Sequence, residues 1–253
     1  MNGTTFIISC EHGGNTVPPA YASLFLGYQS LLQTHRGWDI GALALAQEMA
    51  AAMSAPLFAA ITTRLLIDLN RSIGHRQLFS EVTRSLPLAT RQKIAMLHYR
   101  PHRDAVESEV ARCIATGQRV IHVASHSFTP ELRGVVRRAD VSFLYDPRRA
   151  GEGPFALQWL TAFGRLRPDL KLRRNYPYEG KADGLTTMLR KRHGVHQYVG
   201  MELEVNQQFA IAGGAAWTAL RADITRALAD VIANGLVTNT DQTASETSSG
   251  GGR

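Results

Sequence analysis

The 253-residue sequence has little cysteine and no long uninterrupted apolar run. The two cysteines, Cys10 and Cys113, lie in apolar segments, which excludes a disulfide framework and predicts two small core residues. No apolar stretch approaches the ~18 residues that a membrane-spanning helix needs, and no basic segment followed by an apolar one marks a signal peptide. We therefore expect a soluble, cytoplasmic protein with no membrane partner.

The sequence also lacks a concentrated run of charge. Lys and Arg number 28 against 21 Asp and Glu, which gives a formal net charge of +7. The basic residues are dispersed, with clusters only at 137–138, 173–174 and 190–192, and aromatic residues do not alternate with them as a nucleic-acid platform requires. We expect no nucleic-acid partner and a small anionic substrate. The sequence leaves the oligomeric state open.

Hydrophobic residues make up 44% of the chain, which is enough for one large α/β domain. Apolar β-branched runs predict strands at 4–10, 119–124, 141–145, 171–174 and 197–205, with one or two more inside 57–70. Helical spacing predicts helices after Asp39, at 89–97, 103–116, 154–165 and 184–191, and from Trp217 to Val231. This alternation is typical of a doubly wound, mostly parallel or mixed sheet flanked by helices.

The domain boundary follows from composition. No repeat or linker divides residues 1–236, so we expect one domain there. Residues 237–253 should form a disordered tail, because TNTDQTASETSSGGGR (238–253) has no apolar period and cannot offset the entropy of ordering.

Polar side chains follow three of the predicted strands. His12 comes after the first strand, His126 after the central one, and Glu204 lies at the end of the last. In such sheets ligands bind beyond the carboxyl ends of the strands. Imidazole and carboxylate groups suit a catalytic zinc ion that keeps one position open for water, with a free carboxylate as general base. The three residues are therefore the minimal parts of metal-assisted amide hydrolysis, but their spacing alone is not specific for it.

Each of these residues also has a purely structural interpretation. His12 stands beside two glycines and could serve as a loop hydrogen-bonding residue, whereas His126 could be a satisfied core histidine. His122 lies inside the strand and is interpreted as structural. Asp39 precedes a helix and could be its N-cap.

A second polar segment, RLLIDLNR (64–71), ends in Asn70-Arg71. The rigid guanidinium fork of arginine binds carboxylates through two hydrogen bonds. The pair could therefore hold an anionic substrate, but taken alone the segment favours a structural ion pair of Arg71 with Asp68 or another acid.

Taken together, these segments resemble the N-formylglutamate amidohydrolase family. The matching stretches are SCEHGGNTVP (9–18), GWDIGALALA (37–46), RLLIDLNRS (64–72), VASHSF (123–128), NYPYEG (175–180) and ELEVNQ (202–207). The resemblance covers most of residues 4–210. It implies a fold similar to zinc carboxypeptidases and aspartoacylase-type deacylases, with the metal at the carboxyl edge of the sheet.

The resemblance implies a Zn²⁺ ion held by His12 and His126. The wider superfamily uses His-x-x-Glu, but here Asn15 stands at the last position, and a neutral amide is a poor zinc ligand. Asp39, which matches an aspartate of the family, is the first choice for the third ligand, and Glu11 is the second.

The resemblance also implies the remaining roles. Glu204 matches the general base, with Glu202 as its rival on the same strand face. Asn70 and Arg71 match a pair that binds the substrate carboxylate, with Arg64 as a helper. Three further residues would line the pocket: Tyr99, His102 and Asn175.

The implied reaction is zinc-dependent hydrolysis of the amide bond of an N-acyl amino acid, releasing formate and glutamate for the name-giving substrate. The alternatives are a carboxypeptidase or another acyl-amino-acid hydrolase, and a non-catalytic metal-containing binding protein.

Overall fold

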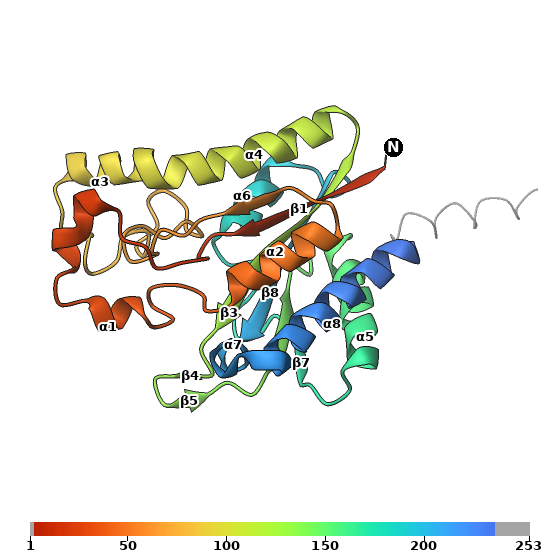
Figure 1. Cartoon of the computed structure of the whole chain (residues 1–253). Helices are drawn as coiled ribbons and strands as arrows, with labels where there is room; N and C mark the ends of the chain where they lie inside the picture. The colour runs from red at the N-terminus through yellow and green to blue at the C-terminus, as the bar shows by residue number, and fades with distance from the viewer. Residues whose placement is uncertain (1–2, 236–253) are drawn as a thin grey trace, which may run out of the picture.

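The computed structural model describes residues 3–235, whose centre is a six-stranded sheet with helices on both faces (Figure 1). The strand order is β2-β1-β3-β8-β6-β7. The first four strands of this order are parallel, β6 pairs antiparallel with β8, and β7 pairs parallel with β6. Their bounds are β1 (Thr4–Cys10), β2 (Leu57–Ala59), β3 (Arg119–Phe128), β6 (Val141–Leu144), β7 (Leu172–Arg174) and β8 (Tyr198–Asn206). The predicted mostly parallel, mixed α/β sheet is confirmed.

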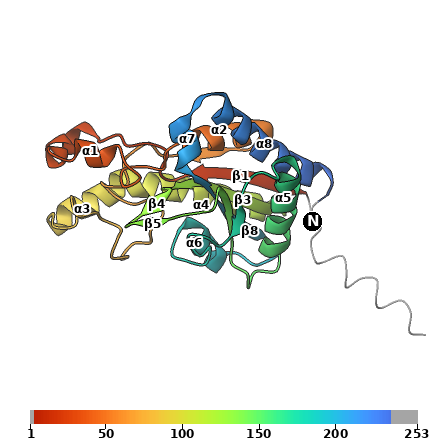
Figure 2. The ribbon, with the colours of Figure 1, turned by 90° about the horizontal axis from the view of Figure 1, so that it is seen from below.

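The two faces of the sheet are covered by different helices (Figure 2). On one face, α2 (Ala42–Ala52), α5 (Glu152–Leu166) and α8 (Gly214–Ala233) enclose the largest core, which contains Leu45, Trp159 and Leu228. On the other face, α4 (Arg100–Ala115) and α6 (Leu185–Arg192) pack on the sheet. Because both faces are buried, the central strands are apolar nearly throughout, and polar side chains are concentrated at their ends.

A second, smaller core lies beyond the carboxyl edge of the sheet, on the left of Figure 1. It contains Tyr21, Phe25, Leu66, Ile67 and Tyr99. The elements around it are η1 (Pro19–Phe25), α1 (Gln29–Leu32), α3 (Leu88–Ile94) and the irregular segment 60–87. We call residues 15–38 and 60–99 the capping region. Its own apolar core fixes a long stretch of irregular backbone above the strand ends.

Two expected elements differ from the structure. Within 57–70 only β2 is a strand, and the rest is turns and bends, because its apolar residues pack into the small core rather than onto the sheet. The two helices expected at 89–97 and 103–116 are one continuous helical run, in which α3 passes through the π-helical segment η2 (Ala95–Tyr99) into α4. Pro101 lies at the start of α4, directly after η2, and the helical run continues through it.

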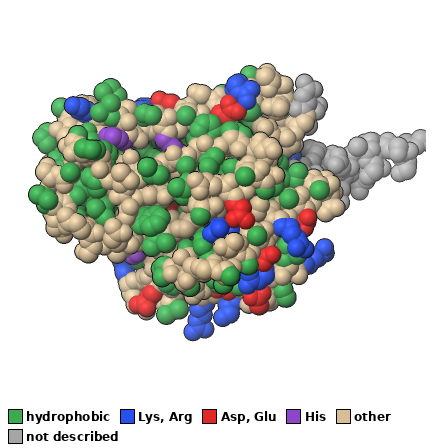
Figure 3. Space-filling model, in the orientation of Figure 1, with side chains coloured by type: hydrophobic (Ala, Val, Ile, Leu, Met, Phe, Trp, Pro, Cys, Tyr) green, Lys and Arg blue, Asp and Glu red, His purple; other side chains and the backbone are tan. Residues whose placement is uncertain are grey.

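The remaining described elements are short: the hairpin β4 (Glu131–Leu132) and β5 (Val135–Val136), and helix α7 (Gln207–Ala212). Among residues 3–235 no helix is long and apolar enough to cross a membrane. On the face shown in Figure 3, Lys and Arg side chains lie among Asp and Glu side chains rather than in one continuous basic surface. The single-domain boundary at residue 236 stays a prediction, and the expected tail lies outside the described residues.

Candidate active site and metal centre

Two close backbone approaches place His12 directly after β1. The following glycines pass against segment 60–61, and a Cβ on Gly14 would lie 2.8 Å from the backbone oxygen of Ile61. The backbone N–H of Gly13 donates to the carbonyl of Ala60 (2.9 Å), and that of Asp39 donates to the carbonyl of His12 (2.9 Å). These contacts explain the two glycines and bring Asp39, 27 residues away, beside His12.

Asp39 does not cap a helix. Helix α2 begins at Ala42, and its N-cap position is Gly41, with a φ of 86° that favours glycine. Any Cβ at Gly41 would lie 2.5 Å from the Cβ of Ala210. The carboxylate of Asp39 is therefore free to point into the site.

His12, Asp39 and His126 form a compact set of ligand atoms, each pair of which lies within 4.8 Å. One oxygen of Asp39, Oδ2, lies 3.3 Å from Nδ1 of His12 and 2.9 Å from Nδ1 of His126. All three side chains are buried. Two imidazoles and one carboxylate are a suitable donor set for a catalytic divalent ion that keeps an open position, so these residues could bind a metal ion.

The other ring nitrogen of each histidine contacts its own carboxylate. Nε2 of His12 lies 2.7 Å from Oδ1 of Asp68, and Nε2 of His126 lies 3.1 Å from Oε2 of Glu11. Histidines that bind metals usually present one nitrogen to the ion and the other to such a group, which fixes the tautomer and the ring orientation. Glu11 therefore lies behind His126, on the side away from Asp39, rather than in the ligand set.

The electrostatics of the centre fit a cation. Burial alone would raise the pKa values of Glu11 and Asp39, but the hydrogen bonds and charges of the adjacent histidines hold both below their usual values. Burial alone would lower the pKa of His126, but Asp39 and Glu11 raise it well above its usual value. The surplus of carboxylates thus holds a proton on His126, and a divalent cation would satisfy the same demand for positive charge.

Glu204 lies beside His126, since the two are register partners on β8 and β3. It is buried, and its Oε2 has no hydrogen-bond partner among the described residues. Burial, with the nearby charges of Asp39 and Glu202, raises the pKa of Glu204 to about 8. Glu202, the rival base, instead accepts a hydrogen bond from the hydroxyl of Thr186 (2.8 Å). A buried carboxylate oxygen without a hydrogen-bond partner, next to the cluster of His12, Asp39 and His126, has properties that a general base needs.

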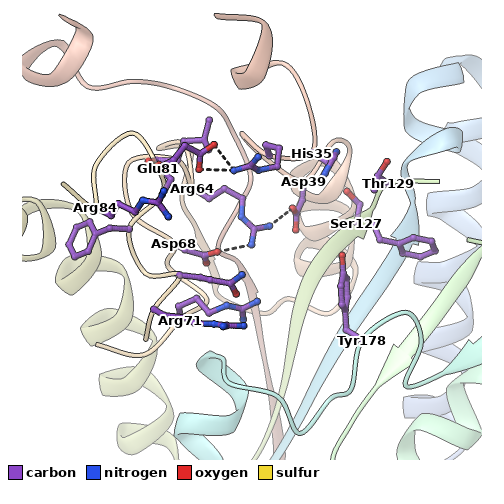
Figure 4. Close-up of a pocket in the computed structure, with 17 residues that line it drawn as sticks. His35, Asp39, Arg64, Asp68, Arg71, Glu81, Arg84, Ser127, Thr129 and Tyr178 are labelled. Atoms are coloured by element: carbon purple, nitrogen blue, oxygen red, sulfur yellow. Dashed lines mark hydrogen bonds and ion pairs between the residues drawn. The ribbon is translucent and has the colours of Figure 1, made fainter. Parts of the chain in front are cut away.

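A cavity of about 420 Å³ opens at this centre (Figure 4). Asp39, on the loop before α2, and Ser127, on β3, line it, and Arg71 and Tyr178 face each other across it. Arg64 extends into it, donating to Asp39 Oδ1 (3.2 Å) and to Asp68 Oδ2 (2.6 Å). The cavity therefore joins Asp39 of the candidate metal-binding cluster to arginines of the capping region.

Comparison with known proteins identifies this arrangement. The family model described as N-formylglutamate amidohydrolase matches residues 4–211. The chain belongs to the N-formylglutamate amidohydrolase family. Membership makes it an amidohydrolase, an enzyme of a class that hydrolyses amide bonds.

Two solved structures are similar to this amidohydrolase. The gene product Atu2144 from Agrobacterium tumefaciens is 26% identical with a TM-score of 0.76, and the match covers 91% of each chain. The N-formylglutamate amidohydrolase from Ralstonia eutropha JMP134 is 18% identical with a TM-score of 0.66, over 92% of this chain and 95% of that one, and it supports the fold. No curated protein matches the chain.

The structure places the amidohydrolase's other predicted site residues at different distances from the cavity. Arg71 lines it, and its guanidinium donates to the carbonyls of Asn70 (3.0 Å) and Asp183 (2.7 Å). No ion pair joins Arg71 to Asp68 in the described chain, because Arg64 takes that carboxylate. The substrate role of Arg71 stays a prediction.

Asn70 is held between two groups. Its amide nitrogen lies 3.4 Å from Nε2 of His126, and its Oδ1 accepts from the backbone N–H of Leu185 (2.7 Å). Tyr99 donates to the carbonyl of Arg71 (2.9 Å) and so fixes the loop that carries it. Both residues position the site.

His102 and Asn175 are not among the residues that line the cavity. Nε2 of His102 lies 3.4 Å from Oε1 of Glu11, behind the histidine pair. Asn175 has a φ of 49°, and its Oδ1 accepts from the backbone N–H groups of Tyr145 and Gly180. These contacts give Asn175 a local structural task, and its contact with substrate stays a prediction. His122 forms hydrogen bonds with the hydroxyl groups of Ser9 and Tyr198 inside the core, as expected for a structural residue.

Sequence reasoning missed the parts played by Asp68 and Tyr178. Asp68 appeared there only as a partner for Arg71, although its spacing from Arg64 (i, i+4) was a usable signal for the ion pair that forms. Tyr178 lies in the matching stretch NYPYEG, but nothing in the sequence indicated that this side chain lines the cavity.

Proposed function

We propose that this protein hydrolyses the amide bond of an N-acyl amino acid of the N-formylglutamate type, releasing formate and glutamate, with Zn²⁺ as cofactor. The observation that carries the proposal is the pair of histidines that share Asp39 while each contacts a second carboxylate, Asp68 or Glu11. His12, Asp39 and His126 would hold the zinc ion. When bound, zinc would lower the pKa of a water molecule and polarise the scissile carbonyl.

Glu204 acts as the general base. Its free carboxylate oxygen can accept a proton from water and then deliver it to the nitrogen of the leaving amino acid. The low-dielectric surroundings that raise its pKa also bring the basicity of this carboxylate close to neutral pH. A nearby divalent cation would favour the ionised form that the first proton transfer needs.

Arginine side chains orient the substrate. The guanidinium of Arg71 faces the cavity without an ion-pair partner among the described residues, and it takes the carboxylate of the amino-acid part. Arg64 is held beside Asp39 and contributes positive charge where the carbonyl oxygen becomes negative. Fixing both ends of the amide in this way lowers the entropic part of the barrier.

The test is metal content together with formate release from N-formylglutamate, measured before chelation, after it and after Zn²⁺ is added back. We expect about one zinc ion per chain, loss of turnover on chelation and recovery on addition. Asp39→Asn should weaken zinc binding and lower turnover together, whereas Asp104→Asn, an exposed acid on α4, should change neither. Undiminished formate release from protein free of metal would overturn the proposal. Release of other acids but not formate would favour the broader acyl-amino-acid hydrolase.

A further inference from the structure

The guanidinium groups around the cavity differ in how their charge is compensated. Arg36 forms an ion pair with Glu81, and Arg64 forms ion pairs with Asp39 and Asp68. In the described chain Arg71 and Arg137 form no ion pair with a carboxylate. Arg71 lines the cavity, whereas Arg137 contacts Tyr178, which lies across the cavity from Arg71 (Figure 4).

Arg137 is a buried cation, with 8% of its surface exposed. Its guanidinium carbon lies 5.9 Å from the ring centre of Phe128 and 5.0 Å from that of Tyr178, and its Nη1 donates to the hydroxyl oxygen of Tyr178 (3.0 Å). These aromatic and neutral contacts stabilise a guanidinium only in part. A buried charge without a countercharge is costly, so this side of the cavity favours an anion.

The hydroxyl of Tyr178 can offer an anion in the cavity a hydrogen bond. Because its oxygen accepts from Arg137, its own proton must be donated elsewhere, and among the described residues it has no acceptor. The side chain lines the cavity, and 44% of its surface is exposed. Tyr178 is therefore an oriented donor backed by a positive charge.

Two other arginines of the cavity, Arg76 and Arg84, also lack ion pairs in residues 3–235, but both are exposed. Water screens an exposed charge, so neither creates a comparable demand for an anion. The buried position of Arg137 distinguishes it from them.

We propose that Tyr178, positioned and polarised by Arg137, binds a second carboxylate of the substrate, across the cavity from the carboxylate that Arg71 takes. The site thereby selects an N-acyl amino acid with an acidic side chain over its neutral amide. This inference rests on the proposed function and adds the residues that determine which amino acid is released.

The experiment compares kcat/KM for N-formylglutamate and for N-formylglutamine, which has the same shape but one carboxylate fewer. We expect the unmodified enzyme to prefer the acid by roughly 10- to 100-fold, the range for a charge-assisted hydrogen bond. Arg137→Gln and Tyr178→Phe should each reduce this preference to about threefold or less, through a higher KM for the acid, while turnover of the amide persists. Arg138→Gln, the exposed neighbouring arginine, is the matched control and should keep the full preference.

A binding measurement separates this inference from the proposed function. Calorimetry with glutarate and with its monoamide needs no turnover, and the same tenfold or larger difference should appear and be lost in Tyr178→Phe. If glutarate discriminates but no N-formyl amino acid is hydrolysed, the proposed function fails while the second carboxylate site stands. Equal use of acid and amide by the unmodified enzyme, or full preference in both variants, would overturn the site. Tyr178→Phe keeps the ring that Arg137 packs on, so it guards against a result due to misfolding of Arg137→Gln.

Discussion

The sheet and the capping region contribute to the site by different physical means. The sheet delivers His126 and Glu204 through strand register, because partners on β3 and β8 necessarily lie side by side. The capping region delivers Arg64, Asp68 and Arg71 on irregular backbone, which a separate small core and individual hydrogen bonds hold in place. We therefore expect the side chains on the sheet to be held rigidly, whereas those of the capping region should shift more easily when a single hydrogen bond is lost.

The largest expected effect is on the sheet side. Glu204→Gln should lower kcat by roughly 100- to 10,000-fold, the usual contribution of a general base, because the amide cannot accept the proton. The content of bound metal should remain, since Glu204 is outside the candidate ligand cluster. Glu202→Gln, two residues earlier and already bonded to Thr186, should reduce kcat far less. A kcat for Glu204→Gln close to that of the unmodified enzyme would remove Glu204 from the mechanism.

A second, smaller effect concerns the stability of the sheet side in metal-free protein. Burial raises the pKa of Glu204 in the folded protein to about 8. A raised pKa contributes stability that is fully present below the pKa of the unfolded chain. This stability is lost as the pH rises through the pKa of the folded protein. The free energy of unfolding of the metal-free protein should therefore decrease as the pH rises from about 4.5 to 8, by at most roughly 1.4 kcal/mol per pH unit.

Denaturant unfolding at several pH values checks this expectation. The decline should be much weaker in metal-free Glu204→Gln, which has no titrating group at that position. Parallel pH dependences for the two proteins would show that Glu204 ionises normally in the folded state.

The smallest effect belongs to the capping region. Asp183 accepts from the backbone N–H (2.9 Å) and the hydroxyl (2.5 Å) of Ser72, next to Arg71. Asp183→Asn should loosen this loop and raise KM by up to roughly tenfold, as expected for a lost charged hydrogen bond, with kcat little changed. Steady-state kinetics against Asp169→Asn, an exposed acid on a different loop, provides the comparison. A change in kcat without a change in KM would mean that the loop acts on chemistry rather than on orientation.

Much of the fold was predictable because apolar periodicity is local. The strands that became β1, β3 and β8 were found within a few residues, as was the long helix α8. The segment 57–70 was not predicted correctly, because its apolar residues have the composition of a strand but pack into the second, smaller core of the capping region. Likewise, nothing local distinguishes a break at Pro101 from a helix that passes through a π turn.

For the site, the sequence by itself determined which polar side chains stand at the strand ends: His12, His126 and Glu204. Only the tertiary structure decided which carboxylate meets which imidazole. It placed Asp39 between the two rings and Glu11 behind one of them, and it brought Asp68 to the other from the capping region. The physical reason is that strand parity fixes the face on which a residue lies, whereas contacts between distant segments depend on how loops pack above the sheet.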